Sequence, residues 1–114
     1  MAETLDIAKD IKKILEDKKG EDIDVLDISD VSVIADYFVV ASAANLPQLN
    51  AMKDELEERL YKDYHLDPKD VEGNRNSTWI LLDYGDIIIH LFTREDRAFY
   101  NLERIWKDGK KVEI

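Results

Sequence analysis

The feature that most constrains the fold is a pair of apolar segments, residues 79–83 and 86–92, joined by the dipeptide Tyr84-Gly85. Both segments are rich in the aliphatic and aromatic residues that strands favour. A two-residue connection containing glycine suits a tight hairpin turn, because glycine tolerates the positive φ angles that such turns require. The sequence therefore predicts an antiparallel hairpin in the last third of the chain.

This turn places Asp83 opposite Asp86, and Trp79 opposite His90. Because successive strand side chains alternate, the hairpin has two faces. One face is almost wholly apolar and is expected to pack under helices: Ile80, Leu82, Ile87, Ile89 and Leu91. The other combines Trp79 and His90 with two aliphatic residues and the two aspartates. It is too apolar for plain solvent exposure and too polar for a deep core, so it resembles a docking surface.

Helical and strand periodicities organise the first part of the chain. Over residues 4–19, apolar residues recur every three or four positions, which predicts a helix that Gly20 ends. Residues 23–28 predict a short strand. Residues 36–42 predict a second, buried on both faces because five apolar residues run consecutively.

Capping residues predict two further helices. Asn45 is a favourable N-cap for the first and Thr93 for the second, which Gly109 ends. Between them, residues 65–77 are expected to form a loop with at most a short strand. The order helix, strand, strand, helix, hairpin, helix predicts a single α+β domain over residues 1–114, with a small mixed β-sheet packed with helices.

The charge balance restricts the partners. The chain has 16 Lys and Arg against 26 Asp and Glu, a net charge of −10, and no cysteine. Residues 1–76 carry 19 acids and 10 bases, whereas residues 77–114 carry 7 acids and 6 bases. A surface of this sign repels phosphate, so we expect little or no direct nucleic-acid contact and a basic partner. No apolar stretch approaches the roughly 18 residues of a membrane span and no leader is recognisable, which predicts a cytoplasmic protein without membrane contact.

Asp83 and Asp86 are expected to be like charges directly opposed, which destabilises a strand pair unless the side chains splay or a cation lies between them. Three interpretations stay open. The pair is either two exposed turn aspartates, an acceptor for Lys or Arg side chains of a basic partner, or a metal site. The metal site lacks a third ligand at a clear spacing.

His90 lies in an apolar strand, where a lone histidine is either a hydrogen-bonded structural residue or a catalyst. No nucleophile with a base is recognisable around it, since the chain has no cysteine and Ser42 and Ser77 lack known motifs. Trp79 is either packed at the edge of the core or an interface anchor.

An enzyme is the main alternative class, because four aspartates lie close together: Asp22, Asp24, Asp27 and Asp30. Alternating carboxylates on a strand can hold the Mg²⁺ of a nucleotidyltransferase. Such an enzyme also needs a Gly-Ser or Gly-Gly turn to hold phosphate, whereas Gly20 is followed by a glutamate, which would repel it. We therefore expect no catalytic, cofactor-binding or metal-binding residues. A generic dimerisation module is a third class.

An ordered set of residues runs along the chain: Asp36-Tyr37-Phe38-Val39-Val40, Gln48, Glu72-Gly73, the stretch 79–86, Ile89-His90-Leu91-Phe92, Arg97, Tyr100, Leu102-Glu103 and Trp106. In this combination the chain resembles the ribosomal silencing factor family, also called Iojap-like. The resemblance implies a nucleotidyltransferase-like fold that lacks the catalytic residues, and no enzyme activity.

It also implies a role in translation. Members of the family bind the large ribosomal subunit through its ribosomal protein number fourteen and hinder joining of the small subunit when nutrients are scarce. They are often homodimers. The hairpin faces and the family motif together predict partner binding at seven residues: Trp79, Asp83, Tyr84, Asp86, His90, Arg97 and Tyr100. Trp79 is expected to supply apolar contact and the two aspartates to accept basic side chains, flanked by Tyr84 and His90. Arg97 and Tyr100 either join the same face or brace the hairpin from within.

Overall fold

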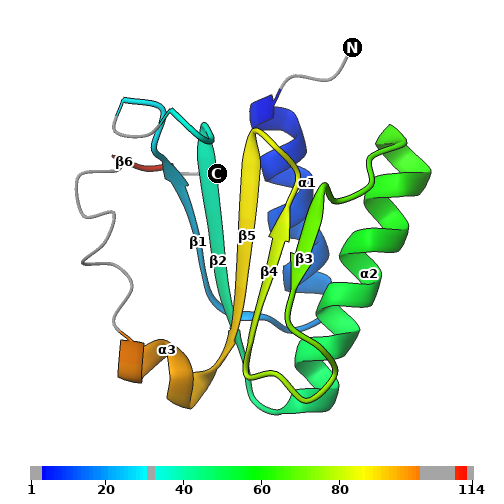
Figure 1. Cartoon of the computed structure of the whole chain (residues 1–114), viewed down its shortest axis with the longest axis vertical. Helices are drawn as coiled ribbons and strands as arrows, with labels where there is room; N and C mark the ends of the chain where they lie inside the picture. The colour runs from blue at the N-terminus through cyan, green and yellow to red at the C-terminus, as the bar shows by residue number, and fades with distance from the viewer. Residues whose placement is uncertain (1–3, 31–32, 101–109, 113–114) are drawn as a thin grey trace.

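A computed structural model describes residues 4–30, 33–100 and 110–112 of the chain. Its elements are α1 (Thr4–Asp17), β1 (Glu21–Asp27), β2 (Tyr37–Ala43), α2 (Leu46–Tyr64), β3 (Asp70–Glu72), β4 (Trp79–Asp83), β5 (Ile87–Thr93), α3 (Arg94–Tyr100) and β6 (Lys110–Lys111). The strands form one sheet in the order β3-β4-β5-β2-β1-β6 (Figure 1). Strands β2 and β5 are parallel and the other neighbouring pairs are antiparallel. The predicted α+β class with a mixed sheet is confirmed.

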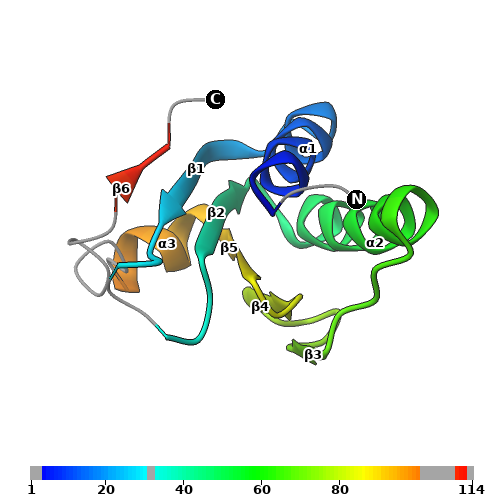
Figure 2. The same cartoon turned by 90° about the horizontal axis from the view of Figure 1, so that it is seen from above.

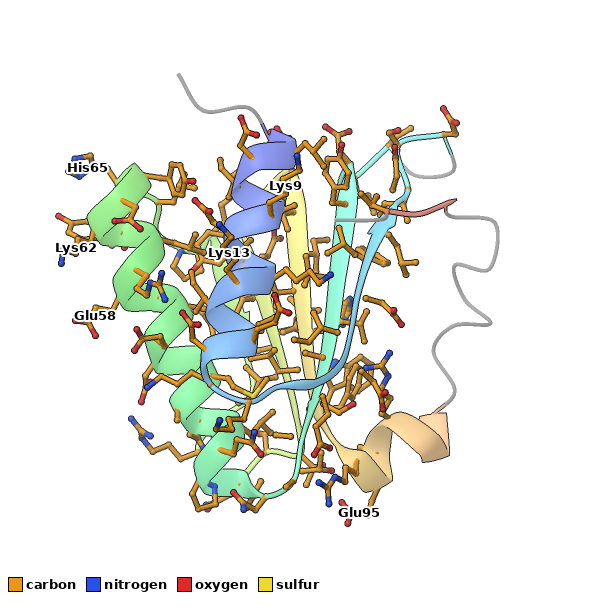
Figure 3. All side chains as sticks on the ribbon, turned by 180° about the vertical axis from the view of Figure 1, so that it is seen from behind. Lys9, Lys13, Glu58, Lys62, His65 and Glu95 are labelled. Carbon is orange, nitrogen blue, oxygen red and sulfur yellow. The ribbon has the colours of Figure 1, made fainter. Side chains whose placement is uncertain are left out.

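Helices α1 and α2 lie side by side on one face of the sheet, and α3 lies on the other (Figure 2). We call these the helix-pair face and the α3 face. The main core lies between the sheet and the helix pair, and its sheet side includes the five residues predicted to pack there: Ile80, Leu82, Ile87, Ile89 and Leu91. The outward sides of α1 and α2 carry charged and polar side chains, among them Lys9, Lys13, Glu58, Lys62 and His65 (Figure 3).

Helix α1 forms where predicted but ends in a different way. Its buried stripe is Ala8, Ile11, Ile14 and Leu15. The left-handed residue beyond its end is Lys19, with φ of 64°, rather than Gly20. The Gly20 N–H donates to the Leu15 carbonyl at 2.8 Å and the Lys19 N–H to the Glu16 carbonyl at 3.0 Å, the hydrogen-bond pair of a Schellman motif. Glycine is needed for close approach, since a Cβ at Gly20 would lie 3.0 Å from that Leu15 oxygen.

The start of α2 is fixed by two side chains. As predicted, Asn45 is the N-cap, and its side chain accepts the Gln48 N–H at 2.9 Å. The Gln48 side-chain carbonyl accepts the Ala44 N–H at 2.8 Å, while its amide donates to the carbonyls of Lys18 and Lys19 at 3.1 and 2.8 Å. One side chain therefore satisfies backbone groups at the start of α2 and the end of α1.

The remaining elements extend the predictions. Strand β2 is buried from Val39 to Ala43 and lies centrally between β1 and β5, as expected for a strand covered on both faces. The short strand anticipated in the loop is β3. Strand β6, which pairs with β1, was not predicted from the sequence. The predicted continuation of the third helix to Gly109 lies outside the described residues.

Candidate functional site

The β4–β5 hairpin forms, but its register differs from the prediction by two residues. Asp83 lies opposite Ile88 rather than Asp86, and Trp79 lies opposite Phe92 rather than His90. The prediction of directly opposed Asp83 and Asp86 was therefore wrong. Because the shift is two, every strand side chain keeps its predicted face.

The position of the turn explains the register. The Tyr84 N–H donates to the Ile87 carbonyl at 2.9 Å, so the tight turn lies at Gly85-Asp86, one position later than the predicted Tyr84-Gly85. Asp83 Oδ1 accepts the Gly85 N–H at 2.8 Å, and Gly85 takes a φ of 88°, which favours glycine. Asp86 thus lies in the turn, exposed, while half-buried Asp83 lies at the end of β4. On its other side Asp83 pairs with Asp70 of β3, so it does face a like charge, but a different one.

On the α3 face, the hairpin holds an aromatic cluster. Trp79 is 36% exposed and its ring lies 5.0 Å from that of Phe92 and 6.0 Å from that of His90. The indole N–H of Trp79 donates to His90 Nδ1 at 3.3 Å. Phe38 of β2 meets the His90 ring edge to face at 5.1 Å. Trp79 is therefore held by the rings of Phe92 and His90, the second of them backed by Phe38, while one part of it faces solvent.

His90 is buried, with 7% of its surface exposed. Burial disfavours the charged imidazolium and lowers the pKa of His90 from 6.5 to about 4. Because Nδ1 accepts the Trp79 N–H, the neutral ring carries its proton on Nε2. This geometry supports the structural interpretation of His90, and places the ring behind Trp79 rather than on the surface.

Tyr84 does not join this face. Its side chain packs against the core beneath the helix pair, and its hydroxyl is buried without a hydrogen-bond partner in the described structure. Burial raises the pKa of the Tyr84 hydroxyl, and the carboxylates of Glu57 and Asp67 raise it further. Contrary to the prediction from the sequence, Tyr84 and His90 therefore do not lie on one surface beside the two aspartates.

Arg97 of α3 braces the sheet, and does so at β1 and β2 rather than at the hairpin. Its guanidinium bonds the Asp24 carboxylate at 2.9 Å, the Ser42 hydroxyl at 3.2 Å and the Asp22 carbonyl. Its side chain is only 11% exposed. These contacts fix the start of α3 against the sheet. Tyr100 ends α3, and its side chain lies outside the described part.

Replacing Arg97 with Met is expected to lower the free energy of unfolding by about 2 kcal/mol, because a largely buried carboxylate and a hydroxyl lose a charged donor. Urea unfolding would measure the loss. Arg94, one turn away, pairs with Glu21, but its side chain is 58% exposed. Arg94→Met is the matched control and should cost less, since solvent screens its ion pair. Equal losses in the free energy of unfolding would show that the contacts of Arg97 stabilise the fold no more than the exposed ion pair of Arg94.

Three of the four aspartates on which the enzyme alternative was based have separate environments in the structure. Asp24 is bound by Arg97, Asp22 is exposed with a φ of 48°, and Asp27 Oδ1 accepts the N–H and hydroxyl of Ser29 at 2.9 and 2.6 Å. Within residues 4–30, 33–100 and 110–112, no three His, Cys, Asp or Glu side chains are grouped to hold a metal ion.

The structure adds Phe38 and Leu26 to the α3 face, where they were not predicted. Across the sheet, they continue the row of paired positions that Asp83 and Ile88 begin. Ile88, Phe38 and Leu26 are half-buried and pack on a small second core. The alternation of strand side chains correctly predicted Ile88 on this face, but the parallel pairing of β2 with β5 was needed to bring Phe38 beside it.

A pocket of about 480 Å³ lies elsewhere, lined by Leu46, Pro47, Asn50, Ala51, Asp54, Arg75 and Asn76. Its polar groups are engaged with each other: the Asn50 amide donates to the carbonyls of Leu46 and Arg75, and Arg75 pairs with Asp54 at 3.2 Å. The α3 face of the hairpin is therefore the stronger candidate site. In the part of the chain that the structure describes, no helix has the length and apolar character needed to cross a membrane.

Comparisons with known proteins agree with the ordered motif. Residues 1–114 match the family described as "Ribosomal silencing factor during starvation". "Ribosomal silencing factor RsfS" of Halalkalibacterium halodurans is 34% identical over 100 residues, covering 88% of this chain and 85% of the relative. "Mitochondrial assembly of ribosomal large subunit protein 1" of Mus musculus is 34% identical over 98 residues, covering 82% of this chain and 42% of that protein.

A solved structure extends the agreement to the fold. The crystal structure of a Chromobacterium violaceum protein superposes with a TM-score of 0.86 at 31% sequence identity, covering 99% of this chain and 92% of the other. The arrangement of strands and helices is thus shared with this structure over 99% of the chain. The chain belongs to the ribosomal silencing factor family.

Proposed function

We propose that this protein binds the large ribosomal subunit through that subunit's ribosomal protein number fourteen, sterically blocks joining of the small subunit, and so represses translation under nutrient limitation. Membership of the ribosomal silencing factor family supports a ribosomal partner. The name of the mouse relative points to the large subunit. The cytoplasm, where bacterial subunits join, is the corresponding location.

The observation that carries the proposal is the partly exposed tryptophan on the α3 face, on the same hairpin as the carboxylates at its turn. Trp79 is held by two rings, so it loses little freedom on binding, and preorganised tryptophans are frequent interface anchors. Asp83 and Asp86 lie at the other end of the same hairpin and can accept Lys or Arg side chains. His90 supports Trp79 from behind, Arg97 holds α3 against β1 and β2, and Tyr84 supports the turn from the helix-pair side.

Charge favours protein over RNA as the contacted component. The chain carries a net charge of −10, which suits the basic surfaces typical of ribosomal proteins and disfavours the phosphates of ribosomal RNA. Little or no direct nucleic-acid contact is therefore part of the proposal.

The proposed mechanism is steric, so no bond is made or broken. A domain on the joining face excludes the small subunit by occupying its place, and affinity and position decide the effect. The nucleotidyltransferase-like fold without catalytic residues belongs to the same proposal. It is supported by Asp24, whose carboxylate binds Arg97 of the same chain. A homodimer away from the ribosome is compatible with this mechanism.

Co-sedimentation with separated ribosomal subunits tests the proposal. The purified protein is expected to sediment with large subunits, not with small ones, and to lower the yield of joined ribosomes when both are mixed. Sedimentation with small subunits only, or with neither, would remove the proposed function. A rise in melting temperature on adding ATP with Mg²⁺ would instead support the enzyme alternative.

A further inference from the structure

The loop between β1 and β2 exposes two adjacent aliphatic side chains. Val33 is 105% exposed and Ile34 is 75% exposed, more than any other large apolar residue in the described ranges. The next are Tyr61 and Trp79, at 53% and 36%. Single exposed aliphatic residues are ordinary. Two adjacent ones form a larger apolar surface, and a partner that buries them gains free energy of binding.

The flanks of this loop are anchored. The Ile28 N–H donates to the Asp36 carbonyl at 2.8 Å, which closes the base of the loop. Ala35, directly after the exposed pair, is 4% exposed and packs with Ile28, Val40 and Phe92 in the second core. The buried alanine and the closed base together fix the chain beside the pair, so Val33 and Ile34 are directed outward by packed neighbours.

The loop is continuous with the surface proposed to bind the ribosome. The Asp86 carbonyl accepts the N–H groups of Asp36 and Tyr37 at 2.8 and 3.1 Å, so the loop is joined to the hairpin turn. Its buried residues belong to the core on the α3 face, and Figure 2 shows the loop on the same side of the sheet as α3. The exposed carboxylates of Asp36 and Asp86 lie at this junction.

We propose that Val33 and Ile34 form the apolar anchor of the docking surface, seated in an apolar depression of the basic ribosomal protein while Asp36 and Asp86 pair with Lys or Arg at its rim. This inference rests on the proposed function and adds a second contact region to Trp79. Charge complementarity and continuity with the α3 face select this occupant. A second copy of the chain would bring the same carboxylates against each other across a two-fold axis, which costs free energy.

Titration of large subunits with Val33→Ser/Ile34→Ser tests the inference. Binding to large subunits should weaken by at least about tenfold, because burial of two aliphatic side chains is lost. Val33→Leu/Ile34→Leu keeps the apolar surface and should bind within about twofold of wild type. Tyr61→Ser, on the outward side of α2, removes a comparable exposed side chain and should leave binding unchanged. Thermal melting of each variant checks the fold, which the exposed positions should leave intact.

Each outcome separates the two proposals. If the wild type fails to bind large subunits, the proposed function falls, and this inference falls with it. If the wild type binds and the serine variant binds equally well, only the loop anchor is removed. Sedimentation velocity tests whether a second copy of the chain is the occupant instead. If the wild type is a dimer, and the serine variant is a monomer that still binds the ribosome, Val33 and Ile34 contact a second copy and the inference is overturned.

Discussion

Combining Trp79→Ala with Asp83→Lys is expected to weaken binding to large ribosomal subunits by at least about a hundredfold, because the anchor and a charge contact are removed together. The tryptophan already packs 5.0 Å from Phe92 and exposes the remainder of its ring to a partner. Its truncation leaves a gap in that partner's pocket. Lysine at position 83 adds repulsion from a basic surface. Co-sedimentation over a range of subunit concentrations measures the change.

A matched control separates contact from general damage. Tyr61→Ala/Glu58→Lys removes an aromatic ring and reverses a charge on the outward side of α2, where Figure 3 shows Glu58 pointing away from the sheet. This control should bind like wild type. If the two double variants bind equally well and both remain folded, the hairpin is not part of the interface.

A single substitution isolates the charge of Asp83. Because Asp83 Oδ1 accepts the Gly85 N–H, lysine there also removes a hydrogen bond from the turn. Asp83→Asn keeps an acceptor at that place and removes only the negative charge. The affinity of Asp83→Asn for large subunits is expected to lie between the affinities of wild type and the double variant. Added salt should weaken binding of the wild type more than binding of Asp83→Asn.

The hairpin shows how far the sequence alone could lead. The alternation of side chains correctly assigned Ile80 and Leu82 to the core and Trp79 to the opposite face, and the two-residue error in register left this assignment intact. The error arose at the turn. The Tyr84 N–H bond to the Ile87 carbonyl places the turn at Gly85-Asp86, and a glycine suits either position of a two-residue turn, so composition does not distinguish this turn from Tyr84-Gly85.

Non-local contacts account for the rest. The parallel pairing of β2 with β5 brings Phe38 beside Ile88, although fifty positions separate them in the chain. Arg97 was placed on the correct helix, but its partners on β1 and β2 follow only from the packing of α3. Tyr84 sits in an otherwise polar turn, so its burial under the helix pair gave no local signal. Helices α1 and α2 were predictable because caps and periodicity are local.

Lowering the pH from 7.5 to 4.5 is expected to destabilise the folded state by roughly 2–3 kcal/mol through His90 alone. Burial lowers the pKa of His90 from 6.5 in the unfolded chain to about 4 in the folded one. The unfolded state therefore binds the proton first as the pH falls. The contribution of His90 is fully present above pH 6.5 and is lost progressively between pH 6.5 and about 4.

His90→Gln isolates this contribution. Glutamine does not titrate and its side-chain oxygen can still accept the Trp79 indole N–H. Carboxylates that titrate in the same range, such as Glu21, whose pKa is lowered by its hydrogen bond from Arg94, affect both proteins alike. Urea unfolding at both pH values should therefore show a larger loss in wild type than in the variant, by roughly 2–3 kcal/mol. Identical losses would mean that His90 is accessible to protons in the folded state, and His90 would then not be the neutral acceptor of the Trp79 indole N–H.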